Sequence, residues 1–463
     1  MGNEKMEEPK ICRGCFREWD KGAAVCPCCG FRPGKRYESM FGWTAGDVLG
    51  KRYLLGMPYC RTADMAVWRI YDTVLSVGCL VLRVMTEEKK TLYRIAGRIR
   101  SAKTRLQSSV VLMAVKEIGM KSVLLFSIEE QELCADMLRE ILSEKTQTEE
   151  IEDPTERLSL PEDGRKKESA LSFGSVLGGR YEILDCVGVG GFGIVYLCRD
   201  LFLRRLAAVK EYFPEEWAQR EETYVMVKKS KMKEAYRFGM KSFYQEARIM
   251  AKFIHTPYVA TVYDVMEAND TVYLIMNYIS GISIGREMRV KDYQPYTPKE
   301  IMEIMIPLLK AVGAFHREQI IHSDISPGNI MRSEEGGIFL IDMGAAKYAL
   351  SSQPVLSAAF LKPDYAAPEQ YQTAKKGIPE NEGPWTDVYE LGATAYYLLT
   401  GQKPPDVVQR LSGKKQDVVL PRKCRPKHRK QWIRFFNHAM ALSIQERIHS
   451  VEEFEEEMRK LLE

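Results

Sequence analysis

A glycine-rich stretch, GVGGFGIVY at residues 188–196, has the residue types and spacing of a phosphate-binding segment. Glycines let backbone amides approach phosphate groups closely, because no side chains intervene. A dinucleotide-binding turn would place these glycines at the start of a helix. Here Ile194–Leu197 instead continue a run that is typical of a β-strand. The pattern therefore predicts a strand-turn-strand hairpin, followed by a strand that carries Lys210 at the end of AAVK.

Four cysteines near the start form two C-x-x-C pairs, Cys12 with Cys15 and Cys26 with Cys29. Each pair can direct two thiolates toward one point, and two pairs complete a tetrahedral S4 shell for Zn²⁺. Such a zinc ion would hold a fold and catalyse nothing, because protein fills all four coordination positions. Cys28 is expected to stay outside the shell. The segment resembles the short zinc ribbons that begin many bacterial proteins, which implies docking or regulation.

Several further motifs between Tyr181 and the C-terminus resemble those of the protein-kinase family. The glycine segment matches G-x-G-x-x-G-x-V, and AAVK matches the family's V-A-I-K. The segments FYQEARIM, HSDISPGNI, IDMGAAK, AAPE and DVYELG follow in the family's order. The residues that match the family's motifs are Gly188, Gly190, Gly193, Val195, Lys210, Glu246, Asp324, Asn329, Asp342, Glu369, Asp387 and, in the closing helical region, Arg447.

The resemblance implies how ATP and Mg²⁺ would be used. Lys210, paired with Glu246, would contact the α- and β-phosphates of ATP. Asp324 would accept the proton of the substrate hydroxyl, and Asn329 and Asp342 would ligate Mg²⁺. Arg447 would form a salt bridge with Glu369. Further ATP contacts are expected from Val187, Gly188, Gly190, Gly191, Gly193, Val195, Ala208, Met276 and Tyr278.

Three residues depart from the family's pattern. Ser323 replaces the Arg of H-R-D, which weakens the case for switching through a phosphorylated activation loop. Ser326 stands where Ser/Thr-specific members usually carry a lysine near the γ-phosphate, and loss of one such charge can lower the rate on the order of a hundredfold. Lys347 or Lys362, which lie in the activation segment between Asp342 and Glu369, could supply the missing positive charge. Met343 replaces the Phe of D-F-G in a packing role.

Three functions stay open at this point. The first is ATP-dependent phosphorylation of serine or threonine hydroxyls on protein substrates, self-phosphorylation included. The second is a small-molecule kinase of the aminoglycoside or choline type, because H-x-D-x-x-P-G-N resembles those families too. They lack the A-P-E segment, so AAPEQY at 366–371 favours a protein substrate. The third is a scaffold that binds ATP without turnover.

The elements that must position these residues follow two kinds of pattern. Arg180–Lys210 alternates apolar and polar residues around the glycines, which predicts three strands. Helical spacing dominates at 241–254, at 299–315 and from Trp385 onward. A β-rich part followed by a helical part predicts an α+β, two-lobed protein-kinase fold over 173–463, with an N-lobe at about 173–279 and a C-lobe at about 280–463.

Three segments precede this domain: the zinc ribbon at 10–32, a small α+β domain at 44–142, and a linker at 143–172. The linker is expected to be flexible, because it is dense in charge and poor in large apolar residues.

The small domain carries a repeat of the kinase domain's start. GDVLGKRYLL at 46–55 matches GSVLGGRYEI at 174–183 in six of ten positions. The similarity continues at an offset of 128 residues as far as Asp72, and at an offset of 149 residues for 109–128. CRTADM replaces the glycines of the second copy, and Gly97 stands opposite Glu246. We expect a degenerate kinase N-lobe used for regulation or recognition, with an unrelated small domain as the alternative.

The composition excludes several classes of partner. A net charge of +4 over 463 residues gives no case for nucleic acid or a membrane surface. Charged residues interrupt every apolar stretch before about 18 residues, so no membrane span is expected. The opening MGNEKMEEPK lacks the apolar core of a signal peptide. A cytoplasmic protein is expected.

Overall fold

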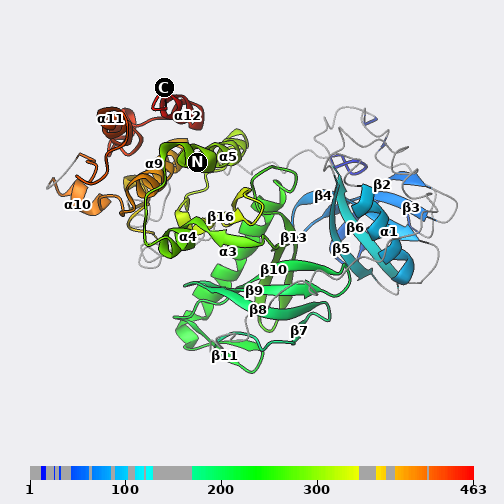
Figure 1. Cartoon of the computed structure of the whole chain (residues 1–463). Coiled ribbons are helices and arrows are strands. Elements are labelled where there is room, and N and C mark those ends of the chain that lie inside the picture. Colours follow the sequence, from blue (N-terminus) through cyan, green and yellow to red (C-terminus); the bar gives the residue numbers. More distant parts are fainter. Residues whose placement is uncertain are drawn as a thin grey trace, which may run out of the picture. The chain divides into compact units, whose positions relative to one another are not determined.

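The computed structural model describes residues 12–16, 25–26, 31–32, 43–61, 65–84, 89–102, 110–118, 121–128, 169–343, 361–371, 381–413 and 417–462 (Figure 1). The chain divides into two compact units, which are described separately. The first unit comprises residues 1–215, 220–225 and 262–277. The second unit comprises residues 216–219, 226–261 and 278–463.

The first unit contains two antiparallel sheets, and the one earlier in the sequence is coloured blue to cyan in Figure 1. Its strands lie in the order β1-β2-β3-β4-β6-β5. Their bounds are β1 Val48–Leu49, β2 Tyr53–Arg61, β3 Met65–Asp72, β4 Val77–Val84, β5 Val110–Ile118 and β6 Lys121–Ile128. Helix α1 (Lys89–Ala102) places Leu92, Ile95 and Ile99 in the same apolar core as the sheet. Burial of this amphipathic face holds helix and sheet together.

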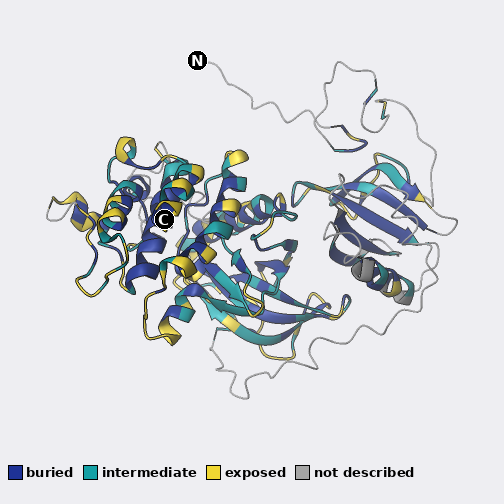
Figure 2. Ribbon diagram, turned by 45° about the horizontal axis from the view of Figure 1, so that its top comes forward, coloured by how far each residue is buried: buried dark blue, intermediate teal, exposed yellow. Residues whose placement is uncertain are grey.

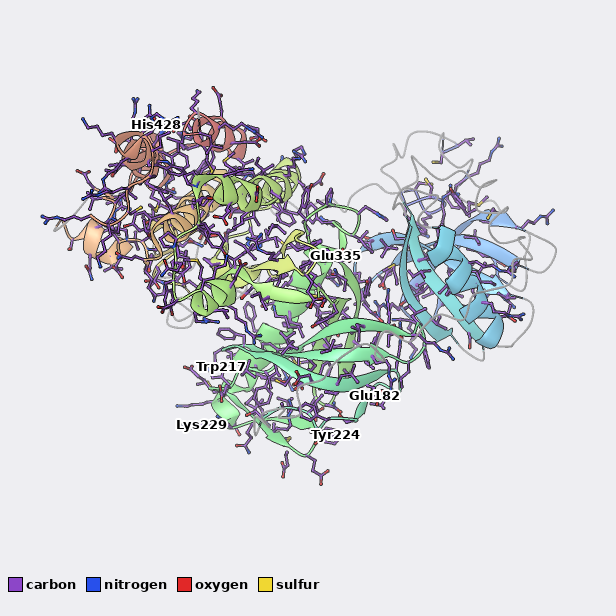
Figure 3. All side chains as sticks on the ribbon, in the orientation of Figure 1. Glu182, Trp217, Tyr224, Lys229, Glu335 and His428 are labelled. Carbon is purple, nitrogen blue, oxygen red and sulfur yellow. The ribbon has the colours of Figure 1, made fainter. Side chains whose placement is uncertain are left out.

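The second sheet, coloured green in Figure 1, lies in the order β13-β14-β10-β9-β8-β7. Its strands are β7 Val176–Leu177, β8 Tyr181–Val189, β9 Gly193–Asp200, β10 Arg205–Tyr212, β13 Val262–Ala268 and β14 Thr271–Asn277. A separate two-stranded sheet joins β11 (Ala218–Glu221) and β12 (Tyr224–Val227). Strands β8, β9 and β10 are the three that the alternation in Arg180–Lys210 predicts. Glu182, labelled in Figure 3, lies on β8. Its carboxylate accepts a hydrogen bond from Nε of Arg199 on β9 at 2.8 Å.

The two sheets share one strand order and one register. Val67 pairs with Leu82 between β3 and β4, and Val195 pairs with Lys210 between β9 and β10. Leu82 also pairs with Leu124 of β6, as Lys210 pairs with Leu274 of β14. Because the registers agree, Leu82 occupies the position of Lys210, and it is 0% exposed.

The register corrects the offset expected for the last two strands. Ile118 pairs with Lys121, and Ala268 pairs with Thr271, so these strands correspond at an offset of 150 residues and not 149. A slip of one residue exchanges the two faces of a strand, and an apolar pattern alone does not resolve it where both faces are apolar.

The end of the expected linker also needs correction. Ser169 accepts a hydrogen bond from Arg220 through its carbonyl oxygen, at 2.5 Å. Leu171 is 5% exposed, and its N–H donates to the hydroxyl of Tyr196 at 3.1 Å. The folded part therefore includes residues 169–172, whereas 143–168 lie outside the described residues. Leu171 is one of the few large apolar residues in that stretch, and its burial anchors the segment.

The second unit is mainly helical. Its helices are α3 Lys233–Ala251, α4 Ile284–Val290, α5 Pro298–Arg317, α9 Pro384–Thr400, α10 Val407–Leu411, α11 Arg429–Ala439 and α12 Val451–Arg459. Short elements complete it: η2 Ser230–Met232, η3 Pro327–Asn329, η4 Ile444–Glu446, and the three-stranded sheet β15 (Gly281–Ser283), β16 (Ile330–Ser333) and β17 (Ile338–Leu340).

Helix α9 is the centre of this unit, since every residue from Thr386 to Thr400 is buried (Figure 2). Helix α5 begins at a capping box, in which the N–H of Thr297 donates to Glu300 at 2.7 Å and the Thr297 hydroxyl accepts from the N–H of Glu300 at 3.3 Å. Such a cap contributes about 1 kcal/mol. Among the described segments, we find no helix with the length and apolar character needed to cross a bilayer.

Candidate active site

The glycine segment forms the tip of a hairpin, as its sequence predicts. Gly188 pairs with Val195, and the N–H of Gly190 donates to the carbonyl oxygen of Gly193 at 2.8 Å. A Cβ atom on Gly193 would lie 2.5 Å from the carbonyl oxygen of Glu211, so a side chain there would displace β10. A Cβ atom on Gly191 would meet nothing within 4 Å. The open space beside Gly191 would let an anion approach the backbone at the tip.

Lys210 lies in the middle of the second sheet, between β9 and β14. Because side chains alternate along a strand, Ala208 and Lys210 share one face of β10 while Val209 and Glu211 share the other. Ala208 pairs with Met276, so two of the expected ATP contacts are neighbours on this sheet. Val187, on β8, is 45% exposed.

The opposite face of β10 holds a buried carboxylate that sequence reasoning missed. Glu211 is 0% exposed and accepts hydrogen bonds from the hydroxyls of Tyr196 and Tyr273, each at 2.7 Å. Arg220 pairs with the same carboxylate at 2.5 Å. Burial, then the charge of Glu211, raises the pKa of both tyrosines, which keeps them as donors. This network fixes β10, and with it Lys210, against the neighbouring strands.

In the second unit, helix α9 fixes the backbone of the segment 322–330. Asp387 is 0% exposed and accepts hydrogen bonds from the N–H groups of His322 at 2.9 Å and Ser323 at 2.8 Å. Glu390, one turn along α9, accepts from the N–H of Ile325 at 2.6 Å. These carboxylates hold Ser323 in a left-handed conformation with φ of +60°. Asp387 thus anchors the loop, as the family resemblance implies.

Within this loop, Asn329 holds Asp324. The Asn329 amide nitrogen donates to the Asp324 carbonyl oxygen at 2.9 Å and to its carboxylate at 2.7 Å. Both bonds use the amide nitrogen, which leaves the amide oxygen to ligate a cation. The N–H of Ile341 donates to the Asn329 carbonyl oxygen at 3.0 Å, so Asp342 follows directly beside it. An amide oxygen and a carboxylate are ligands that suit Mg²⁺. Met343 is 5% exposed, in keeping with a packing role.

The salt bridge expected between Glu369 and Arg447 is present. Arg447 donates to the two carboxylate oxygens of Glu369 at 2.7 and 3.1 Å, and both residues are buried. Thr386 donates to the same carboxylate at 2.8 Å. The side-chain amide of Gln370 donates to the Ser323 carbonyl oxygen at 2.9 Å. This bond joins residues 361–371 to the catalytic loop at 322–330. Lys362 contacts Asp324 and Ser326, whereas Lys347 lies outside the described residues.

For two of the expected site residues, Glu246 and Tyr278, only the position in the fold can be given. Glu246 lies on α3 and is 1% exposed, but its expected pairing with Lys210 would join the two units and stays a prediction. Tyr278 is the first residue of the second unit after β14.

The cysteine cluster has a geometry that suits Zn²⁺. One sulfur atom from each of Cys12, Cys15 and Cys26 lies within 4.8 Å of the others. The sulfurs of Cys15 and Cys26 are 3.7 Å apart, close to the ~3.8 Å between two thiolates on one tetrahedral zinc ion. Cys29, the expected fourth ligand, lies outside the described residues.

A sheet with a glycine hairpin next to the strand of Lys210, and a helical unit in which Asp387 anchors the loop of Asp324 and Asn329, are the two parts of a protein-kinase domain. The chain belongs to the protein kinase family, since the family model "Protein kinase domain" matches residues 181–463.

Curated relatives include the serine/threonine-protein kinase PrkC of Bacillus subtilis, which is 31% identical over 51% of this chain and 33% of its own length. PknB of Mycobacterium tuberculosis, also a serine/threonine-protein kinase, is 31% identical over 50% of this chain and 34% of its own length. The chain thus spans about a third of the length of these relatives. Among solved structures, the apo form of PpkA-294 is 30% identical, with a TM-score of 0.54, over 64% of this chain and all of that one.

Proposed function

We propose that this chain transfers the γ-phosphoryl group of ATP to serine or threonine hydroxyls of proteins. The observation that carries the proposal is the position of Asp324, whose carboxylate is held by the Asn329 amide in a loop anchored by Asp387 and Glu390. A general base must be fixed in this way to meet a hydroxyl proton. The printed names of PrkC and PknB support the serine/threonine class.

In this mechanism the substrate hydroxyl oxygen forms a bond to the γ-phosphorus while the bond to the β,γ-bridging oxygen breaks. ADP leaves with that electron pair, and Asp324 takes the hydroxyl proton. Lys210 and the amides of the glycine hairpin bind the phosphates. Asn329 and Asp342 would hold Mg²⁺, which supplies neutralising charge when bound.

A specific observation favours a protein substrate over a small alcohol. Residues 361–371 are ordered by the Glu369–Arg447 salt bridge and by the bond from Gln370 to Ser323. A segment fixed beside Asp324 can align an extended peptide, whereas a small alcohol needs no such surface. The small-molecule kinase and the ATP-binding scaffold are the outcomes against which the proposal is tested.

The decisive experiment incubates the full chain with MgATP and protein acceptors, then maps phosphosites by mass spectrometry. Phosphoserine or phosphothreonine on an acceptor or on the chain itself, with none in Asp324→Asn, is expected. Turnover only with a small alcohol would identify a small-molecule kinase. ATP binding with no turnover by the wild-type chain would identify a scaffold.

We further propose that the small α+β domain at 44–142 is a degenerate copy of the kinase N-lobe. Besides the shared register, Arg52 pairs with Asp72 at 2.7 Å as Arg180 pairs with Asp200 at 2.5 Å. The copy has Leu82 at the position of Lys210, so it is not expected to bind ATP.

The contacts of this copy support a regulatory role. Asp264, on the edge strand β13, pairs with Arg52 at 2.9 Å and with Lys116 of the edge strand β5 at 2.8 Å. Arg205 donates to the carbonyl oxygens of Leu112 and Met113 on β5, at 2.6 and 2.8 Å. The turn between β9 and β10 also places a leucine, Leu203, in the apolar core of the first sheet. We propose that the copy stabilises the kinase sheet by binding at its edge strand β13. We also propose that the zinc ribbon at 10–32 acts together with the copy in regulation or docking.

A further inference from the structure

The catalytic loop of this chain has no lysine or arginine of its own. The segment HSDISPGNI at 322–330 contains neither residue type. Ser326, which is 2% exposed, places a neutral hydroxyl two residues after Asp324. Catalysis of phosphoryl transfer rests mainly on charges placed around the moving group, so a loop without a cation lacks one of the larger contributions.

Lys362 brings a cation to this loop from the activation segment. Its Nζ atom lies 3.0 Å from a carboxylate oxygen of Asp324 and 2.9 Å from the hydroxyl oxygen of Ser326. Its side chain is 39% exposed, and that of Asp324 is 16% exposed. One ammonium therefore bridges the general base and the residue that stands in place of the loop lysine.

Hydrogen bonds from the residues that follow hold the backbone of Lys362. The N–H groups of Tyr365 and Ala366 both donate to the Lys362 carbonyl oxygen at 2.9 Å. Leu361, which is 9% exposed, packs against Ala366 and Tyr371. A backbone held on both sides limits the positions that the ammonium can reach.

We propose that Lys362 is a catalytic residue that contacts the transferred phosphoryl group and supplies the charge that Ser326 lacks. This inference rests on the proposed kinase activity. A lysine ammonium has three donors. The bonds to Asp324 and Ser326 use two of them, and the third would serve a γ-phosphate oxygen of bound ATP.

Two other roles of Lys362, inhibition of Asp324 and a purely structural role, predict different rates of phosphoryl transfer. If Lys362 only blocked Asp324, its removal would free the general base and raise the rate. If it only ordered the segment, a lysine moved to position 326 would not replace it.

The test uses the full chain with Lys362→Met, which keeps the apolar stem, and the double variant Lys362→Met/Ser326→Lys. Lys403→Met is the matched control, because Lys403 pairs with Asp364, two residues from Lys362, at 2.7 Å and is 71% exposed. The rate constant for phosphoryl transfer and the Kd for ATP are measured for each. In the Asp324→Asn variant, acylation of the Lys362 and Lys403 amines is measured by mass spectrometry with and without MgATP. This measurement does not require turnover.

We expect Lys362→Met to lower kcat on the order of a hundredfold, the double variant to recover at least about tenfold, and Lys403→Met to leave kcat unchanged. MgATP should protect Lys362 from acylation and not Lys403. A kcat for Lys362→Met equal to or above wild type, no recovery in the double variant, or equal acylation of Lys362 with and without MgATP would overturn the proposal. An inactive wild-type chain would instead refute the kinase activity, while the acylation result would still test Lys362.

Discussion

Replacement of Asp264 should loosen the N-terminal copy from the kinase sheet. Burial raises the pKa of this carboxyl group, but Lys116 and Arg52 lower it, and the resulting pKa is about 2 against a usual value of 3.8. A pKa lowered in this way corresponds to a stabilisation on the order of 2 kcal/mol at neutral pH. Asp264→Asn keeps the shape and removes the charge, so the contact should weaken by about this amount.

The dependence on pH has a definite sign. Because the pKa is lowered in the folded protein, the stabilisation is present above the usual pKa of 3.8 and is lost as the pH falls through about 2. The difference between wild type and Asp264→Asn should therefore be full at pH 7 and should shrink below about pH 4.

Hydrogen exchange followed by mass spectrometry measures this loosening. Peptides that cover β5 (Val110–Ile118) and β13 (Val262–Ala268) should exchange a few tens of times faster in Asp264→Asn at pH 7, as expected for about 2 kcal/mol. Asp292→Asn is the control, since Asp292 is exposed on the second unit. Unchanged exchange in both strands, or equal acceleration in the control, would refute the role assigned to Asp264.

Three further predictions follow from the site and its supports. Glu369→Gln should lower the free energy of unfolding of the kinase domain by about 3–5 kcal/mol, measured by urea denaturation, because it leaves the buried Arg447 without its partner. The chain should bind one equivalent of zinc in elemental analysis; Cys26→Ala should lose it and Cys28→Ala should keep it, and equal zinc in both would contradict the ligand set. Titration with a fluorescent ATP analogue should give one site per chain that Lys210→Met abolishes, whereas two sites would show that the N-terminal copy binds nucleotide.

Local patterns were sufficient wherever the chemistry depends on residues close in sequence. The β-type run after the glycines predicted the hairpin of β8 and β9, because alternation along a strand is a local property. The buried bridge between Glu369 and Arg447, which are 78 residues apart, was predicted by the resemblance to the kinase family and not by a local pattern. The order of the strands in the N-terminal copy agrees with the repeat, although the repeat's second offset was wrong by one residue.

Contacts between segments that are far apart in the sequence could not be predicted from local patterns. Glu211 reads as an ordinary strand residue, and only the folded sheet surrounds it with Tyr196, Tyr273 and Arg220. Asp264 likewise gains its charge partners from two distant segments, Lys116 about 150 residues away and Arg52 about 210 residues away.

The sequence by itself determined the family and the hairpin of β8 and β9, and it brought Asp324 and Asn329 into one loop, because the family's motifs fix the types and spacing of those residues. Only the tertiary structure placed the ammonium of Lys362 against Asp324 and Ser326. It also decided that Leu82 fills the position of Lys210 in the first copy. Charge acts through distance in space, and the separation of two residues along a chain does not set that distance until the strands and helices have packed.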